Sequence, residues 1–110
     1  MTSKTRRART EEVIGEILAE RTRQVEKEGF SEEHDDRHDG GELAAAAAAY
    51  AMAPYPIYLK TDLADGVGFK DCFPWGPGYD GRKKHSYKRC LVIAGALIVA
   101  ELERIGRDRA

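Results

Sequence analysis

The sequence has few cysteines, no long apolar run and almost no net charge. Its two cysteines, Cys72 and Cys90, provide no disulfide framework and favour a reducing, cytoplasmic setting. The longest apolar run, Leu91–Ala100, is about half as long as a membrane-spanning helix requires. No apolar signal-peptide segment follows the charged start. With 18 basic and 19 acidic residues, the net charge of −1 gives no reason to expect nucleic acid or a membrane as a partner.

A chain of 110 residues is expected to form one domain around one modest core. Four basic residues precede residue 10, and they predict a flexible basic tail over residues 1–9. The remaining residues, 10–110, are expected to form a single helical domain.

The first predicted helix runs from Thr10, a candidate N-cap, to Glu28, and Gly29 provides its end. Arg21 and Glu28 lie inside its apolar stripe, and Gln24 lies at the edge of the stripe. Because a buried charge is costly without a partner, polar groups at these positions indicate a site. The apolar residues of the stripe have helical spacing and are Ile14, Ile17, Leu18 and Val25.

Two further helices are predicted, over Glu42–Ala53 and Ser86–Ile105, and Ser31 is expected to cap a short turn before them. The first of the two contains six consecutive alanines, which form helix readily and let a neighbour approach closely. The second is apolar all round at its centre, so we expect it to be buried on every side. One small domain can hardly surround a helix, so we expect a homo-oligomer, with Ala94 facing outward into the interface.

The segment between these helices, residues 54–85, shows no clear periodicity and contains all four prolines and most of the aromatic residues. A long irregular segment in a small domain is usually functional or disordered. Its aromatic density argues against disorder.

The sequence HDDRH places His34 and His38 at i and i+4, the spacing of two metal-binding imidazoles on one helical face. The two His-Asp pairs are similar to those of metal-dependent HD-domain phosphohydrolases. No third ligand lies at a convincing spacing, so we expect no tightly bound zinc. The other interpretation is that these groups cap helix ends and pair with neighbouring arginines.

A set of carboxylates suggests magnesium instead, because Mg²⁺ prefers hard oxygen ligands and accepts substrate phosphates as co-ligands. The stretch GGELAAAA faintly resembles the first motif of the all-α MazG-type nucleotide pyrophosphohydrolases. That family's double glutamate is missing, and AELERIGRD lacks its usual glutamate-to-aspartate spacing. The carboxylates of this alternative are Glu28, Asp35, Asp36 and Glu42.

A third pattern combines polar groups near the helices with the aromatic segment. Arginine binds phosphate through paired hydrogen bonds, and aromatic rings stack on any base. This pattern predicts a nucleotide pocket; the alternative is that the rings fill a small core and the lysines are solvated. The residues are Arg21, Gln24 and Arg89 as donors, Phe73, Trp75 and Tyr79 as stacking rings, and Lys83, Lys84 and His85 as positive charge.

Three stretches of the chain together carry a resemblance to known proteins: AERTRQVEKEGFSEEHDDRHDGGELAAAAAAYA, FPWG and KRCLVIAGALIVAELERI. Together they resemble a family of small proteins encoded by phages and prophages, in which tryptophan is common where Phe30 stands. The resemblance implies either a protein that sequesters a nucleotide-derived immune signal or a nucleotide-pool enzyme similar to MazG. It carries over no residue-by-residue chemistry.

The sequence therefore predicts an all-α homo-oligomer with three main helices and a long aromatic-rich connection. We expect it to capture a phosphorylated, nucleotide-like molecule in the host cytoplasm, without a cofactor, and thereby to counter host defence. The alternatives are a magnesium-dependent hydrolase and a protein-binding inhibitor that uses the aromatic segment as its hot spot. The predicted ligand-binding residues are Arg21, Gln24, Glu28, His34, Asp35, Asp36, His38, Glu42, Phe73, Trp75, Tyr79, Lys84 and Arg89.

Overall fold

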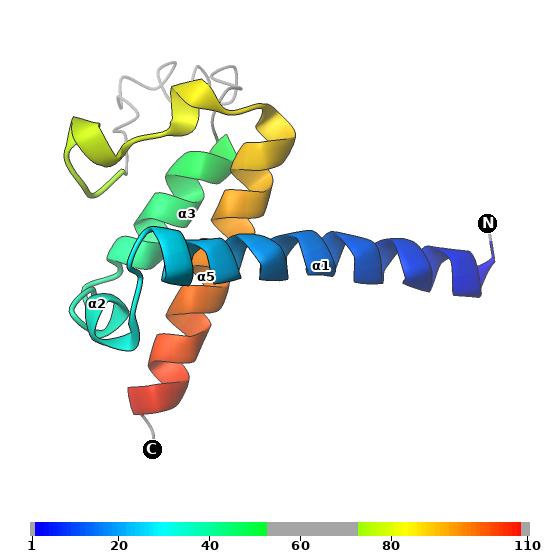
Figure 1. The fold of residues 1–110 in the computed structure, drawn as a ribbon, viewed down its shortest axis with the longest axis horizontal. Helices are drawn as coiled ribbons and strands as arrows, with labels where there is room; N and C mark the ends of the chain where they lie inside the picture. The colour runs from blue at the N-terminus through cyan, green and yellow to red at the C-terminus, as the bar shows by residue number, and fades with distance from the viewer. Residues whose placement is uncertain (1, 53–72, 109–110) are drawn as a thin grey trace, which may run out of the picture.

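The computed structural model describes residues 2–52 and 73–108 of the chain, and these residues contain helices and no strand. The protein therefore has the all-α fold with three main helices that the sequence predicts (Figure 1). None of the described helices is long and apolar enough to cross a membrane. The helices are α1 (Ser3–Lys27), α2 (Glu32–Asp36), α3 (Glu42–Met52) and α5 (Tyr87–Asp108).

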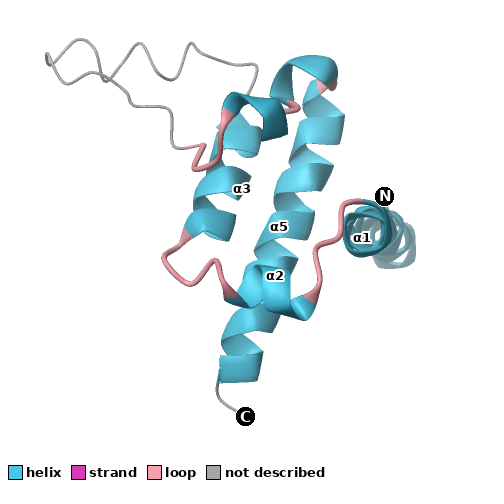
Figure 2. Cartoon of the chain, turned by 60° about the vertical axis from the view of Figure 1, so that its left-hand side comes forward, coloured by secondary structure: helices cyan, strands magenta, loops and turns pink. Residues whose placement is uncertain are grey.

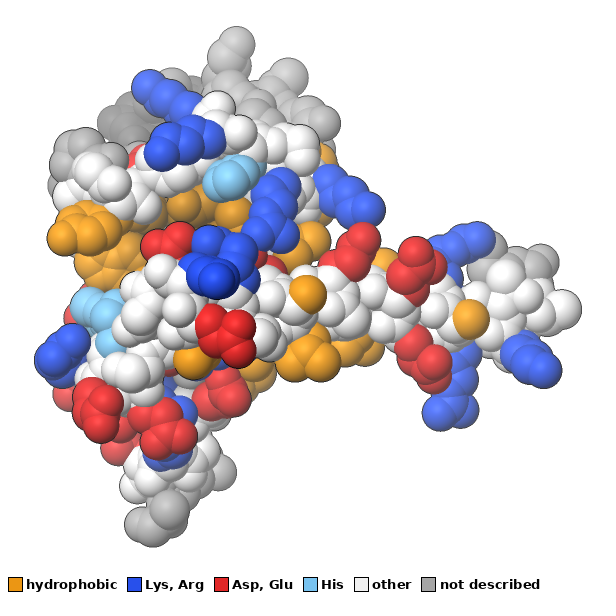
Figure 3. Space-filling model, in the orientation of Figure 1, with side chains coloured by type: hydrophobic (Ala, Val, Ile, Leu, Met, Phe, Trp, Pro, Cys, Tyr) orange, Lys and Arg blue, Asp and Glu red, His pale blue; other side chains and the backbone are white. Residues whose placement is uncertain are grey.

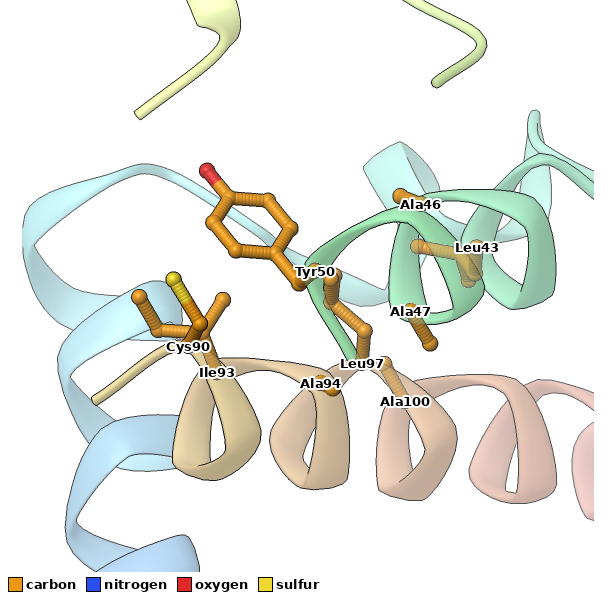
Figure 4. Close-up of a cluster of buried hydrophobic side chains, with 9 residues drawn as sticks. All are labelled: Leu43, Ala46, Ala47, Tyr50, Cys90, Ile93, Ala94, Leu97 and Ala100. Carbon is orange, nitrogen blue, oxygen red and sulfur yellow. The ribbon is translucent and has the colours of Figure 1, made fainter. Parts of the chain in front are cut away.

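The core lies between α3 and α5, which run side by side (Figure 2). Alanines on both helices let the backbones approach closely, and Leu43, Ile93 and Leu97 fill the remaining space (Figure 4). Ala94 belongs to this core and is 3% exposed, so the prediction that it faces outward is wrong. Its face of α5 is already occupied by the alanine helix.

Helix α1 crosses α5 at a glycine. A Cβ atom on Gly95 would lie 2.9 Å from Cδ1 of Ile17, so the absence of a side chain there permits the crossing. The predicted start of α1 at Thr10 is wrong, because the helix begins at Ser3, and the region expected as a tail is helical. The side chain of Thr2 accepts a hydrogen bond from the backbone N–H of Thr5, which caps that start.

The apolar stripe of α1 is largely exposed, with Ile14 and Leu18 at 58% and 65%. The buried residues of α1 are instead Glu20, Arg21 and Gln24. The helical period correctly identified the stripe but not the face that the fold covers. That face is polar because its charges find partners elsewhere in the chain.

Helix α5 is also exposed along one face of the single chain. Burial on every side would therefore require a second copy of the chain, and it stays a prediction. Ser86 caps the helix as predicted, because its hydroxyl accepts a hydrogen bond from the N–H of Arg89. The helix continues through Gly106 to Asp108 and does not end at Ile105. Its exposed large apolar residues are Leu91, Ile98, Leu102 and Ile105.

The short helix α2 turns the chain back from α1 towards α3. Ser31 caps it as predicted, accepting a hydrogen bond of 3.1 Å from the N–H of His34. The turn needs glycines at both ends, since Gly29 and Gly41 have φ angles of 75° and 91°. Of the predicted irregular connection, residues 54–72 lie outside the described part. The rest contains two 3₁₀ helices, Pro77–Tyr79 and Arg82–Lys84.

Candidate ligand-binding site

The buried carboxylate of Glu20 links α1 to α5. Arg23 donates to both of its oxygens, at 2.8 and 3.1 Å, and Arg89 of α5 donates to Oε1. The side-chain amide of Gln24 donates to Oε2 at 3.3 Å. Arg23 also donates to Glu28 at 2.8 Å, so one chain of charges extends from α5 to the end of α1.

This network keeps Glu20 ionised. Burial alone would raise the pKa of Glu20, but the hydrogen bond from Arg23 and the charges of Arg23 and Arg89 outweigh burial and lower the pKa below its ordinary 4.5. The same contacts with Glu20 and Glu28 raise the pKa of Arg23. Glu20 and Arg23 are therefore both charged at neutral pH.

The lowered pKa of Glu20 gives a prediction for acid stability. A carboxylate with a depressed pKa in the folded state stabilises the protein above its unfolded pKa, and this stabilisation is lost as the pH falls through the folded value. Parent and Glu20→Gln protein should therefore differ most in free energy of unfolding at neutral pH, and the difference should shrink below pH 4.5. Urea unfolding across the pH range measures this. A difference that stays constant with pH would contradict the assignment.

A second buried network joins α1 to α2. Arg21 donates through Nη2 to Asp35 at 2.6 Å and through Nε to Glu103 at 2.9 Å. The Asp35 side chain is fully buried, and its other oxygen lies 2.9 Å from Nδ1 of His34. Asp35 thus holds both the guanidinium of Arg21 and the imidazole of His34 in place.

A cavity of about 620 Å³ opens between the end of α1, the turn at α2 and the segment after residue 73. Its floor is apolar, formed by Ile93 and Leu97 of α5 and by Tyr50 of α3. The hydroxyl of Tyr50 points out of the core (Figure 4) and accepts a hydrogen bond of 3.0 Å from the N–H of Gly81. Burial raises the pKa of Tyr50, against the opposing effect of this bond, so the hydroxyl stays protonated at neutral pH.

One wall of the cavity is a continuous cluster of rings. Phe30 stacks on His34 with 4.3 Å between ring centroids, and His34 lies edge-on to His38 at 4.8 Å. His38 lies 5.3 Å from Trp75, which also contacts Phe73 at 5.7 Å and Phe30 at 6.5 Å. Offset and edge contacts at these distances are favourable and hold the rings in place. Figure 3 shows hydrophobic side chains between two histidine patches above the left end of α1.

Two buried polar atoms at the cavity have no hydrogen-bond partner in the described part of the chain. They are Oε1 of Gln24, an acceptor, and Nε1 of Trp75, a donor. The contact with Glu20 orients the Gln24 amide, because the carboxylate accepts a hydrogen bond from Nε2, and Oε1 is then the amide atom without a partner. A buried polar group without a partner costs about 1–3 kcal/mol. A bound molecule with both a donor and an acceptor would satisfy the two atoms.

The charges around the cavity are of both signs. Arg23 and Lys84 carry positive charge at its edge, and His85 adds an imidazole. Glu20, Glu28 and Asp80 supply carboxylates, and Glu20 and Glu28 are already paired with Arg23. Lys84 is exposed and can therefore reach an anionic group at the mouth of the cavity.

The structure brings many of the sequence-predicted residues to this cavity and places others apart. Three lie one contact away: Arg89 through Glu20, Phe73 against Trp75, and Glu42 at 3.5 Å from His38. Arg21 and Asp35 form the second network, and Asp36 pairs with Arg107 of α5 at 2.8 Å. The predicted residues that line the cavity are Gln24, Glu28, His34, His38, Trp75, Tyr79 and Lys84.

Sequence reasoning did not assign Glu20, Phe30, Tyr50 or Asp80 to the site. A signal for Glu20 was present, because its four-residue spacing to Gln24 puts the two on one helical face with Ile17. Tyr50 interrupts a run of alanines, and nothing local shows that its hydroxyl leaves the core. Phe30 and Asp80 depend on how the turn and the later segment fold back.

The carboxylates proposed for magnesium do not converge. They contact different groups: Glu28 pairs with Arg23, Asp35 with Arg21, Asp36 with Arg107 and Glu42 with His38. Within residues 2–52 and 73–108, no three or more His, Cys, Asp or Glu side chains are grouped so that they could hold a metal ion.

No protein-family model, curated protein or solved structure shows significant similarity to this chain.

Proposed function

We propose that the protein captures a phosphorylated, nucleotide-like small molecule in this cavity and leaves it chemically unchanged. The main support is the pair of unpartnered atoms, Gln24 Oε1 and Trp75 Nε1, beside a wall of aromatic rings. A nucleobase offers a flat face for the rings together with donors and acceptors at its edge. The cavity volume of about 620 Å³ is within the usual range for small-molecule sites.

Within this proposal, the charged groups bind the rest of the ligand. Lys84 and the imidazole of His85 contact phosphate at the cavity mouth, and Glu28 accepts hydrogen bonds from ribose hydroxyls. Arg23 holds Glu28 and Glu20 in place, so these carboxylates add little net repulsion. The site needs neither a metal nor a nucleophile for these contacts.

Removing the indole ring should weaken binding. We expect Trp75→Ala to lower the affinity for a bound nucleotide by about 1–3 kcal/mol, the usual contribution of one stacked base. Trp75→Phe is the matched variant, because it keeps a flat ring and removes the Nε1 donor, and we expect it to bind with intermediate affinity. Isothermal titration calorimetry measures both, with thermal melts to confirm folding. Equal affinities for folded Trp75→Ala and the parent would place the ligand elsewhere.

Capture and hydrolysis give different results in one incubation. The parent protein is mixed with magnesium and a panel of nucleotides that includes cyclic dinucleotides and ADP-ribose, then denatured, and the released compounds are identified by mass spectrometry. Recovery of the intact ligand supports capture. Release of pyrophosphate or a nucleoside monophosphate would support the MazG-like alternative instead.

The biological setting of the proposal follows from the sequence resemblance. A phage-encoded protein of this kind would remove a nucleotide-derived immune signal from the host cell and so counter its defence. We expect no nucleic-acid or membrane partner, and we expect the protein to assemble with copies of itself.

A further inference from the structure

Helices α1 and α5 each extend well beyond the point where they cross. From Ile17, which contacts Gly95, α1 continues for 14 residues to Ser3, about 21 Å at the α-helical rise. From Gly95, α5 continues for 13 residues to Asp108, about 20 Å. Figure 1 shows the two halves pointing in different directions from the crossing. We call them the α1 arm (Ser3–Ile17) and the α5 arm (Gly95–Asp108).

Both arms carry apolar side chains that their own chain leaves exposed. On α1 these are Ile14 and, just past the crossing, Leu18; on α5 they are Ile98, Leu102 and Ile105. The five side chains are 37–65% exposed. Their spacings of four residues on α1, and of four and three on α5, place them on one face of each helix. Figure 3 shows hydrophobic side chains gathered below α1 near its crossing with α5.

The two arms also have different charges at their ends. The α1 arm begins with Lys4, Arg6, Arg7 and Arg9 and contains no acidic residue before Glu11. The far end of the α5 arm lies beside α2, whose Glu32 and Glu33 are exposed, and Asp36 pairs there with Arg107. The basic end of one arm is therefore complementary to the acidic surroundings of the other.

We propose that a second copy of the chain covers these arms, in a two-fold dimer in which the α1 arm of each protomer lies along the α5 arm of its partner. A two-fold axis that bisects the angle between the two arms brings the α1 arm of one protomer alongside the α5 arm of the other. The apolar face of each α1 arm then meets the apolar face of the partner's α5 arm, and the contact occurs twice in the dimer. The nearly equal lengths, the apolar faces and the opposite end charges all fit this single arrangement. The proposal does not depend on the ligand of the cavity.

Sedimentation equilibrium and light scattering test the dimer. We expect the parent to have the mass of two chains, and Ile14→Glu and Ile98→Glu to raise the dimer dissociation constant by about tenfold or more, equivalent to about 1.4 kcal/mol. Higher salt should weaken the parent dimer through its end charges. Val13→Glu is the matched control, because Val13 is exposed on α1 but lies about 120° from the stripe.

The outcomes are distinct. Dissociation by the two stripe variants, with the control still dimeric and all variants folded by circular dichroism, supports the proposal. A monomeric parent, or an assembly that Val13→Glu weakens as much as Ile98→Glu, overturns it. If a glutamate variant does not fold, Leu102→Gln replaces it, because that side chain is 63% exposed and the fold of one chain does not need it.

Discussion

Replacing Asp35 with alanine should lower the free energy of unfolding by about 3–5 kcal/mol, the usual cost of breaking a buried ion pair. Asp35 is fully buried and accepts from Arg21 at 2.6 Å. Its removal leaves Arg21, whose side chain is only 10% exposed, with Glu103 alone. It also frees the imidazole of His34 from the oxygen 2.9 Å away, so the ring wall of the cavity should loosen. Urea unfolding of the parent and the variant measures the loss.

The neighbouring residue supplies the matched control. Asp36 also pairs with an arginine, Arg107, but its side chain is 51% exposed, and solvent screens such pairs. Asp36→Ala should therefore unfold at nearly the parental urea concentration. Equal destabilisation by the two substitutions would contradict the assignment of Asp35 as the buried anchor of α2.

Replacing Glu20 with alanine should lower the free energy of unfolding by about 1.5–3 kcal/mol, the range for hydrogen bonds to charged groups. The loss is smaller than for Asp35 because both arginines that contact Glu20 can still reach solvent, with side chains 41% and 37% exposed. Glu20→Ala should also weaken ligand binding, since the amide of Gln24, a residue that lines the cavity, loses the contact that orients it. Urea unfolding and calorimetry measure the two effects separately.

Glu16 is the control for Glu20, one turn earlier on α1. It pairs with Lys88 at 3.2 Å on the surface, where such a pair contributes about 0–1 kcal/mol. We expect Glu16→Ala to bind ligand as the parent does. A Glu20→Ala protein as stable as Glu16→Ala would show that the buried network does not hold α1 on α5.

The fold class follows from local signals that the sequence displays openly. Each of these signals depends only on residues close to it in the sequence. They are the alanine run of α3, the serine caps at Ser31 and Ser86, and the end of α1 at Gly29. The early start of α1 was missed because threonine looked like a cap at residue 10. Inside the helix, however, the Thr10 hydroxyl donates to the carbonyl of Arg6.

Which face of α1 is buried could not be read from its periodicity. The apolar stripe predicted burial, yet the contact with α5 is made by Ile17 and by polar residues whose partners are distant in sequence. Glu20 depends on Arg89, 69 residues away, and Arg21 depends on Glu103. Such pairs become favourable only after the helices meet, so no local pattern reveals them.

The candidate site was predictable in its residue types but less so in its arrangement. The histidines and Trp75 were predicted to bind the ligand, and the ring contacts place them on one wall of the cavity. Arg21 has the residue type of a phosphate ligand, but its Nη2 and Nε donate to Asp35 and Glu103, and it is not among the residues that line the cavity. Only the three-dimensional contacts distinguish a donor already paired with the protein from one left for a ligand.

The most direct test of the central claim is mass spectrometry of small molecules released by denaturing the purified protein. The parent should release an intact phosphorylated, nucleotide-like compound in an amount comparable to the protein, and Trp75→Ala purified in the same way should release much less. A parent that releases no such compound, or only as much as folded Trp75→Ala, would contradict capture in this cavity.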